Sequence, residues 1–292
     1  MSVLMKGADV ANAMKEELIE KTNHLKEQGV TPCLAIVRVG SRPDDLSYER
    51  GAKKRMEMIG IECRIVELAE DIEQKEFERA FEKVNDDPSV HGILLFRPLP
   101  GHLDEEAIKA MIRPEKDMDC MSPVNIAKVF AGDETGYAPC TAEAVVEMLD
   151  HYGIDVTGKR VTVVGRSMVV GKPLAMMLLK KHATITVCHT RTVELAKTCR
   201  EAEILVAAAG KAKMITSDMV GDDAVVADVG INVDESGNLC GDVDFDAVES
   251  KTSYISPVPR GVGSITTSVL AKHVVCAATV SYTHLTLPTN RE

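Results

Sequence analysis

A regular alternation of short apolar segments with amphipathic ones constrains the fold of this chain more than any other feature. The segment "GADVANAMKEELIEKTNHLKEQG" places Val10, Met14, Leu18 and Leu25 on one helical face and stops at Gly29. The apolar run "PCLAIVRVG" follows it and predicts a strand. Strands that alternate with helices imply parallel β-sheet with right-handed crossovers.

The first half continues this alternation. After "PCLAIVRVG" we predict a helix over 47–60, a strand at "IECRIVEL", a charged helix over 72–85, a strand at "VHGILLFRPLP" and a short helix over 104–112. The segment "YAPCTAEAVVEMLDHYG" then predicts a linking helix.

The second half repeats the pattern with strands that are almost continuously apolar. These predicted strands are "RVTVVG" (160–165), "TITVCHT" (184–190), "EILVAAAG" (203–210), "AVVADVGIN" (224–232) and "SYISPVP" (253–259). Such runs are typical of parallel sheets with helices on both faces, so this half resembles a nucleotide-binding α/β domain.

Length predicts two domains, because single cores rarely grow much past about 200 residues and the chain has 292. We expect an α/β fold with a first domain over 1–140 and a second over 141–264. A helix over about 265–279 packs back on the first domain in this prediction. The residues 280–292, which do not continue the apolar pattern of that helix, receive no function.

Composition excludes several classes of protein. The net charge of −11 argues against a nucleic-acid binder. We find no apolar run near the roughly 18 residues of a membrane span and no signal peptide, so the expected location is cytoplasmic. The 8 cysteines form no CxxC pair and the 8 histidines no HExxH spacing. We therefore expect reduced cysteines and no metal site.

A glycine-containing loop follows the strand "VTVVG" and precedes a predicted helix. Gly165 and Gly171 bracket "RSMVV", with Arg166 and Ser167 between them. Amides at a helix N-terminus favour an anion such as a phosphate. The spacing is GxxxxxG, not the GxGxxG of the common dinucleotide fingerprint, so an ordinary tight turn between strand and helix is the alternative.

The next predicted strand ends in "CHTRT". An enzyme specific for NAD commonly has an acidic residue there, which holds the ribose hydroxyls. Thr190, Arg191 and the earlier Arg166 would instead accommodate a ribose 2′-phosphate, which favours NADP over NAD. The alternative is that Arg191 is a solvated loop residue.

The segment "SYERGAKKRMEMIG" predicts an amphipathic helix with Tyr48, Ala52, Met56 and Ile59 near one face. Tyr48 falls at the first turn of this predicted helix. An aromatic hydroxyl there is typical of a pocket wall and equally of a helix packed between domains.

Five motifs together resemble one enzyme family. In this order and spacing, "KDMDCMSP", "GRSMVVGKP", "DVGIN", "GDVDF" and "SPVPRGVGSIT" are similar to the tetrahydrofolate dehydrogenase/cyclohydrolase family, from the first helix to about residue 278. The resemblance implies a folate-binding α/β domain, a Rossmann-like NADP-binding domain and a cleft between them. It also implies a homodimer and tetrahydrofolate derivatives as substrates.

The resemblance also implies roles for particular residues. Tyr48 would stack along the folate, Asp119 of "KDMDC" would bind the pterin, and both are the expected catalytic residues. The turn from Pro257 to Gly263 would line the cleft. The substrate-binding residues are then Tyr48, Asp119, Pro257, Gly261 and Gly263, and the cofactor-binding residues are Gly165, Arg166, Ser167, Gly171, Thr190, Arg191 and Ile231.

The chain departs from the family pattern where hydrolysis is concerned. Bifunctional members have a lysine where this chain has Ala52 and a glutamine where it has Phe96. Lys53 and Lys54 are neighbours in sequence, but a helix turns about 100° per residue, so neither projects where residue 52 does. Arg97 is displaced by one residue in a strand and so faces the other way.

A further departure lies in the cleft turn. Arg260 stands where the family has a glycine, and a left-handed backbone there would cost an arginine about 1 kcal/mol or more. Ser264 replaces a proline, a milder change. Arg260 either reduces activity or contacts a ligand phosphate.

These departures separate two reactions. Hydride transfer from 5,10-methylenetetrahydrofolate needs alignment of donor and acceptor, whereas hydrolysis of the methenyl product needs proton transfer, worth roughly 10²–10⁴-fold per group. We therefore predict a dehydrogenase with cyclohydrolase activity weak or lost. The alternatives are a bifunctional dehydrogenase/cyclohydrolase, a non-catalytic folate- or NADP-binding protein, and an unrelated Rossmann-type oxidoreductase.

Overall fold

The computed structural model describes the backbone of residues 2–286 and the side chains of residues 2–282. The chain forms two compact units. The six-stranded unit comprises Met1–Ala13, Val129–Asp133 and Pro139–Thr266, and the three-stranded unit comprises Met14–Lys128, Glu134–Ala138 and the residues from Thr267 onward. Both units are mixed α/β, as predicted.

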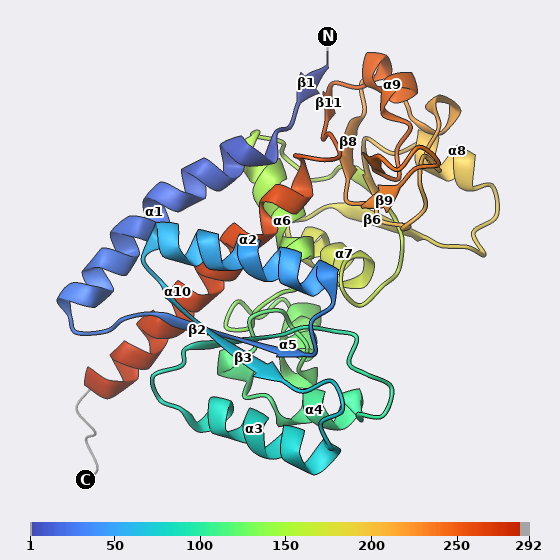
Figure 1. Cartoon of the computed structure of the whole chain (residues 1–292). Coiled ribbons are helices and arrows are strands. Elements are labelled where there is room, and N and C mark those ends of the chain that lie inside the picture. Colours follow the sequence, from blue (N-terminus) through green and yellow to red (C-terminus); the bar gives the residue numbers. More distant parts are fainter. Residues whose placement is uncertain (1, 287–292) are drawn as a thin grey trace. The chain divides into compact units, whose positions relative to one another are not determined.

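The six-stranded unit contains a parallel sheet with strand order β1-β11-β8-β7-β5-β6 (Figure 1). Its strands are β1 (Val3–Leu4), β5 (Arg160–Val164), β6 (Thr184–Cys188), β7 (Ile204–Ala207), β8 (Val225–Asp228) and β11 (Tyr254–Ile255). Strands β5, β7 and β8 are almost wholly buried, which explains their continuous apolar sequence. The strand β1 was not predicted; it pairs with β11, so the first residues group with this unit.

Helices connect these strands. They are α6 (Cys140–His151), α7 (Gly171–Lys180), α8 (Leu195–Arg200) and α9 (Phe245–Val248), with short 3₁₀ turns at Ser217–Met219, Glu249–Lys251 and Val262–Ser264. An antiparallel hairpin of β9 (Asn232–Val233) and β10 (Leu239–Cys240) follows β8. Its strands have only two residues each, too short for an alternation of side chains to reveal them in the sequence.

The three-stranded unit has a parallel sheet in the order β3-β2-β4. Its strands are β2 (Cys33–Val39), β3 (Glu62–Leu68) and β4 (Gly92–Leu95). Its helical segments are α1 (Gly7–Glu27), α2 (Pro43–Ile59), α3 (Gln74–Asp86), α4 (Glu105–Met111), a 3₁₀ turn at Pro114–Lys116, α5 (Pro123–Ala131) and α10 (Thr266–Thr286). Helices α1 and α5 cross into the other unit, as does the first residue of α10.

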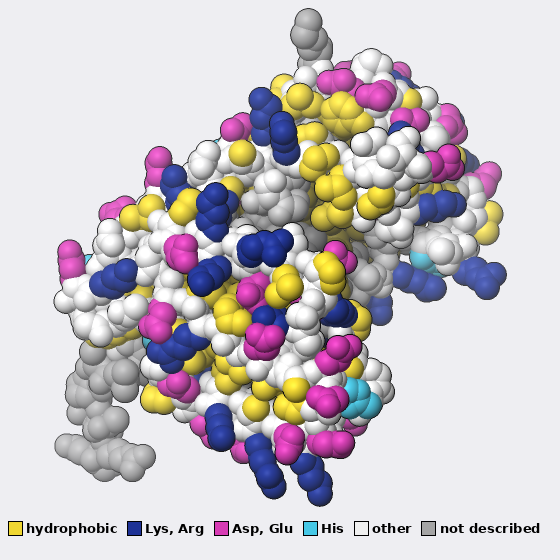
Figure 2. Space-filling view, in the orientation of Figure 1, with side chains coloured by type: hydrophobic (Ala, Val, Ile, Leu, Met, Phe, Trp, Pro, Cys, Tyr) yellow, Lys and Arg dark blue, Asp and Glu magenta, His cyan; other side chains and the backbone are white. Residues whose placement is uncertain are grey.

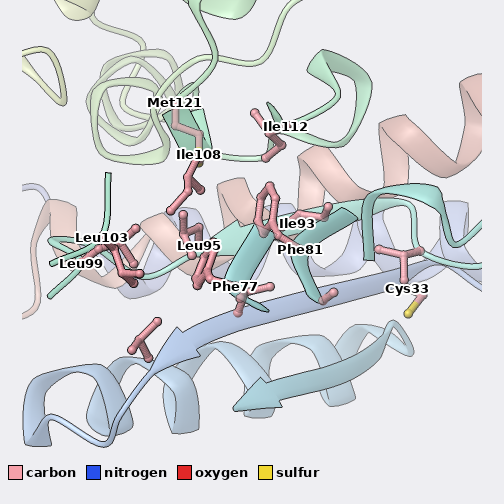
Figure 3. Close-up of a cluster of buried hydrophobic side chains, with 14 residues drawn as sticks. Cys33, Phe77, Phe81, Ile93, Leu95, Leu99, Leu103, Ile108, Ile112 and Met121 are labelled. Carbon is pink, nitrogen blue, oxygen red and sulfur yellow. The ribbon is translucent and has the colours of Figure 1, made fainter. Parts of the chain in front are cut away.

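Figure 3 shows buried side chains of the core of this unit, to which strands β2 and β4 contribute Cys33, Ile93 and Leu95, α3 contributes Phe77 and Phe81, and α4 contributes Ile108. The rings of Phe77 and Phe81 stack with centroids 5.8 Å apart and planes 18° apart. Both rings are fully buried, and burial of each contributes roughly 1.5–3 kcal/mol. The two residues are one helical turn apart, which places both rings on the same face of α3.

Several sequence-based expectations about the helices need correction. Helix α2 begins at Pro43, whose fixed φ suits the first turn, so Tyr48 lies in the second turn and not the first. Helix α5 was not predicted. Helix α10 continues to Thr286, so the backbone of residues 280–286 is helical although their sequence does not continue the apolar pattern; residues 287–292 of the predicted tail lie outside the described residues.

One described stretch, Val262–Tyr282, is long and apolar enough to cross a membrane, contrary to our expectation that none exists. Of its most apolar window, 67% is buried inside the protein. Core helices pass the same test of length and composition, so this stretch is weak evidence for a span. On the face shown in Figure 2, basic and acidic side chains are interspersed.

Candidate functional site

The loop after β5 turns tightly into helix α7. A Cβ on Gly165, whose φ is 135°, would collide with the carbonyl of Ala208, and one on Gly171 would collide with the backbone of Gly165. The Oγ of Ser167 accepts a hydrogen bond from the amide of Val170 at 3.1 Å. Helix α7 has no acidic residue in its first turn, so the positive end of its dipole is open to an anion.

The ends of β5 and β6 lie side by side. The amide of Gly165 donates a hydrogen bond to the carbonyl of Cys188 at 2.9 Å. Because the strands are parallel, Arg166 and the pair Thr190 and Arg191 emerge at the same edge of the sheet. All three side chains are exposed. The structure thus groups the predicted residues of the glycine loop with those of "CHTRT".

This edge of the sheet is where the strand order reverses. Strand β5 lies between β6 and β7, so the chain leaves β5 in one direction and returns on its other side. Ligands of open parallel sheets bind outside the carboxyl ends of the strands at such a reversal. The narrow loop, the helix N-terminus and the two guanidinium groups fit the phosphates of a dinucleotide. Among the described residues, no cluster of three or more His, Cys, Asp or Glu could hold a metal ion.

A cavity of about 170 Å³ in the same unit contains four other predicted residues. Ile231, Pro257, Gly261 and Gly263 all line it. The side chain of Ile231 is 68% exposed, so it is accessible to a ligand in this cavity.

Arg260 also lines this cavity, and its φ is 79°. The predicted left-handed backbone is therefore confirmed. The carbonyl of Arg260 accepts a hydrogen bond from the amide of Gly7 at 2.9 Å, which helps to hold the turn. The side chain itself is exposed.

In the three-stranded unit, Tyr48 lies against Phe96. Their ring centroids are 5.8 Å apart and the rings meet edge to face at 84°. Phe96 is 8% exposed and Tyr48 is 37% exposed. The amide of Phe96 donates to the carbonyl of Val37 at 2.9 Å, which fixes its position beyond the end of β4. An apolar ring therefore occupies the position next to the tyrosine.

The basic side chains that follow Ala52 and Phe96 in the sequence do not point in the directions of these two residues. Ala52, one helical turn beyond Tyr48, is fully buried, whereas Lys53 and Lys54 are exposed. Arg97 lies beyond the end of β4, and its Nη1 is 3.8 Å from Oε1 of Glu105. The prediction that neither lysine takes the direction of residue 52 is confirmed.

The "KDMDC" turn is organised by its first aspartate. The carboxylate of Asp117, which is 1% exposed, accepts hydrogen bonds from the amides of Met121 and Ser122, both at 2.9 Å. The side chain of Asn125 donates to it at 2.9 Å. Asp119, the predicted pterin ligand, is half-buried two residues later.

The same turn is attached to β4 and to α10. The amide of Met118 donates to the carbonyl of Ile93 at 3.3 Å, and Nδ1 of His273 lies 2.8 Å from the carbonyl of Met118. Burial, followed by the carboxylates of Asp117 and Asp119, raises the pKa of Cys120 to about 12. A buried thiol with a raised pKa forms little thiolate, which disfavours a nucleophilic role for Cys120.

Comparisons with known proteins agree with this architecture. The catalytic-domain model of the tetrahydrofolate dehydrogenase/cyclohydrolase family matches residues 5–119, and the model of its NAD(P)-binding domain matches residues 139–282. The chain belongs to this family. "Bifunctional protein FolD" of Clostridioides difficile is 59% identical over 274 residues, covering 94% of this chain and 96% of that protein.

Solved structures of the family are similar over nearly the whole chain. The bifunctional dehydrogenase/cyclohydrolase FolD of Campylobacter jejuni matches with a TM-score of 0.93 at 40% identity, covering 96% of this chain and 99% of that one. The Trypanosoma brucei enzyme, "complexed with NADP cofactor and inhibitor", matches with a TM-score of 0.90 at 36% identity, covering 96% and 98%.

Sequence reasoning missed several residues of this family member. It chose Asp119 but not Asp117, whose burial only the fold reveals. The motifs "DVGIN" and "GDVDF" did not reveal that Asp228 and Asp242, the first aspartate of each, are 3% and 0% exposed. An aspartate within an apolar segment, as in "VVADV", was the available signal, because carboxylates are almost never fully buried unless partnered.

Proposed function

We propose that this protein is an NADP-dependent 5,10-methylenetetrahydrofolate dehydrogenase of one-carbon metabolism. The observation that carries the proposal is the grouping of the residue 165–171 loop with Thr190 and Arg191 at the strand-order reversal of a Rossmann-like sheet, in a chain of this family. The reaction removes a hydride from the methylene carbon of the substrate and leaves the methenyl cation. NADP⁺ supplies the hydride acceptor when bound.

The residues of the six-stranded unit would bind and orient the cofactor. The first-turn amides of α7 and the loop residues Gly165, Ser167 and Gly171 would hold the diphosphate. Arg166, Thr190 and Arg191 would hold a ribose 2′-phosphate, which favours NADP over NAD. The Trypanosoma brucei relative was solved in complex with NADP, which supports NADP as the cofactor.

The folate substrate would use Tyr48 and Asp119, with Pro257, Gly261, Gly263 and Ile231 in contact with substrate or cofactor. The 37% exposure of Tyr48 supports a platform role, since much of the ring is accessible for stacking on a pterin. Hydride transfer requires mainly alignment of the two reacting carbons, so no protein base is needed for it.

Hydrolysis of the methenyl product is the second candidate function. The curated relatives are named "Bifunctional protein FolD", which favours a bifunctional enzyme over our prediction of a weak or lost cyclohydrolase. Two residues near Tyr48 affect the rate that we expect for the hydrolysis of the methenyl product. Ala52 and Phe96 offer no group that transfers a proton, so we propose that hydrolysis proceeds more slowly here than it would with a lysine and a glutamine.

We further propose a homodimer in the cytoplasm, in keeping with the family resemblance. A non-catalytic folate- or NADP-binding protein is the remaining alternative, because Arg260 stands where the family has a glycine in the turn from Pro257 to Gly263. It predicts stabilisation by ligands without turnover.

One time course tests the two proposed activities together. Purified protein is mixed with 5,10-methylenetetrahydrofolate and NADP⁺, and NADPH and the methenyl product are recorded separately. Formation of NADPH supports the dehydrogenase, and its absence refutes it. Methenyl decay faster than in buffer supports the bifunctional enzyme; decay at the buffer rate supports a monofunctional dehydrogenase.

A further inference from the structure

Two buried aspartates of the six-stranded unit have no role in the proposed function. Asp228 ends β8 in "DVGIN", and Asp242 lies in "GDVDF". They are 3% and 0% exposed. Within the described residues neither carboxylate has a cationic partner; each is bound by N–H donors alone. A buried charge persists only when its acceptor sites are satisfied in this way.

Asp242 binds three successive amides of the loop after β7. Its Oδ2 accepts from Ala209 at 2.6 Å and from Gly210 at 2.9 Å, and its Oδ1 accepts from Lys211 at 2.8 Å. The side chain of Asn232 also donates to Oδ1 at 2.9 Å. Successive amides that converge in this way form an anion-binding nest, which here is filled by a carboxylate of the protein itself.

The nest determines where the carbonyls of the same peptides point. In a trans peptide the carbonyl of one residue is antiparallel to the amide of the next. The carbonyls of Ala208, Ala209 and Gly210 therefore point away from Asp242. The carbonyl oxygen of Ala208 indeed lies where a Cβ on Gly165 would be, between the ends of β7 and β5.

Asp228 holds Asp242 in place. The Oδ1 of Asp228 accepts hydrogen bonds from the amide of Gly230 at 2.9 Å and from the amide of Asp242 at 3.0 Å. The Oδ2 of Asp228 accepts one from the amide of Val243 at 2.9 Å. The aspartate pair thus joins the loop after β7, the loop after β8 and the "GDVDF" segment.

We propose that Asp242, supported by Asp228, is a positioning residue for the cofactor. It turns the backbone carbonyls of residues 208–210 toward the crevice at the strand-order reversal, where they accept hydrogen bonds from ribose hydroxyls and the carboxamide of NADP⁺. The inference rests on the proposed function. It assigns the diphosphate to the loop after β5, because the amides of the loop after β7 are already occupied.

The test compares Asp242→Asn with Asp246→Asn. Asparagine at residue 242 keeps the shape of the side chain but turns an amide NH₂ toward the N–H donors of the loop after β7. Asp246 is an exposed residue of α9, so Asp246→Asn is a control with the same change of charge. NADP⁺ affinity is measured by calorimetry at a temperature where melting curves show each protein folded. The KM values for NADP⁺ and for methylenetetrahydrofolate are measured separately.

We expect Asp242→Asn to raise the Kd and KM for NADP⁺ roughly tenfold or more, the effect of losing bonds to a charged group. The KM for the folate substrate should stay within about twofold, and Asp246→Asn should match the wild type. Equal NADP⁺ affinity of wild type and Asp242→Asn overturns the proposal. A wild-type protein that fails to bind NADP⁺ refutes the proposed function itself, and the inference with it.

A measurement on the wild type decides the matter if Asp242→Asn fails to fold. A hydrogen bond accepted by a carbonyl polarises its peptide group, so NADP⁺ should shift the amide nitrogen resonances of Ala209, Gly210 and Lys211 in NMR spectra. These amides should remain protected from exchange, because they still donate to Asp242. Resonances that do not move when NADP⁺ binds contradict the proposal.

Discussion

The surroundings of Tyr48 and those of the loop after β5 are built from opposite kinds of groups. Around Tyr48 the structure offers the ring of Phe96 and the methyl group of Ala52, both buried. Around the loop after β5 it offers amides and two guanidinium groups, and in the loop after β7 the carboxylate of Asp242 accepts hydrogen bonds from three amides and from the side chain of Asn232.

This difference corresponds to the different demands of the two reactions. Hydride transfer depends on holding two ligands in alignment, which a rigid network of hydrogen bonds provides. Hydrolysis depends on moving protons, which a phenyl ring and a methyl group do not do. The comparison therefore predicts a competent dehydrogenase with a slower hydrolytic step.

Adding polar groups to the substrate site should have the largest effect. We expect the double variant Ala52→Lys with Phe96→Gln to accelerate methenyl hydrolysis roughly 10²- to 10⁴-fold, because the lysine adds an amine able to transfer protons and the glutamine adds a hydrogen-bonding amide beside it. The loss of methenyl absorbance with purified substrate measures this rate.

The matched control is Ala52→Met with Phe96→Gln, which adds similar length at residue 52 without an amine. If that control accelerates hydrolysis equally, the gain comes from space and not from proton transfer. If neither variant exceeds the wild type, the chain already hydrolyses the product by other groups, and the contrast between the two sites has no catalytic meaning.

A substitution that displaces the loop of residues 165–171 should produce the next largest effect. Gly171→Ala places a Cβ against the backbone of Gly165 and should displace the loop by enough to lower kcat/KM for NADP⁺ roughly 10²-fold. Gly101→Ala is the control, because nothing lies within 4 Å of a Cβ there. Steady-state rates over a range of NADP⁺ concentrations measure the effect, and an unchanged kcat/KM would show that this loop does not hold the cofactor.

The buried carboxyl group of Asp228, in the six-stranded unit, should make the free energy of unfolding depend on pH. Burial raises the pKa of Asp228 from 3.8 to about 6. The folded state therefore binds this proton more tightly than the unfolded state. Its stabilising contribution is complete below a pH of about 4 and is lost as the pH rises through about 6.

The wild type should accordingly lose about 1 kcal/mol of unfolding free energy between pH values of about 5 and 7 relative to Asp228→Asn, which lacks this titration. Urea titrations at several pH values measure it, with Asp246→Asn as the variant of matched charge. Parallel pH profiles for wild type and Asp228→Asn would contradict the shifted pKa.

The smallest effect concerns the strained turn at the cavity. Arg260→Gly should raise the free energy of unfolding by about 1 kcal/mol, because glycine adopts a φ of 79° without the steric cost of a side chain. Arg260→Ala keeps a Cβ in the same backbone conformation and should gain nothing. Equal stability of the two variants in urea unfolding would show that the turn carries no strain.

Local pattern was sufficient for much of the fold. The apolar strands of both sheets and the helices between them follow from periodicity, because a strand covered on both faces and a helix covered on one leave distinct patterns. Several short elements were not predicted from the sequence. The two-residue strands β9 and β10 and the helix α5 carry too few periodic positions, and α10 extends further than its apolar pattern.

The sequence by itself determined the family, the two-domain α/β class, the glycine-bounded loop and the absence of a lysine at residue 52 and a glutamine at residue 96. These are matters of residue type and spacing. Only the tertiary structure decided that Phe96 meets Tyr48, that Asp117 organises the "KDMDC" turn and that Asp242 binds the loop after β7. Such contacts join residues far apart in the chain, so they depend on strand order and burial, which no local pattern records.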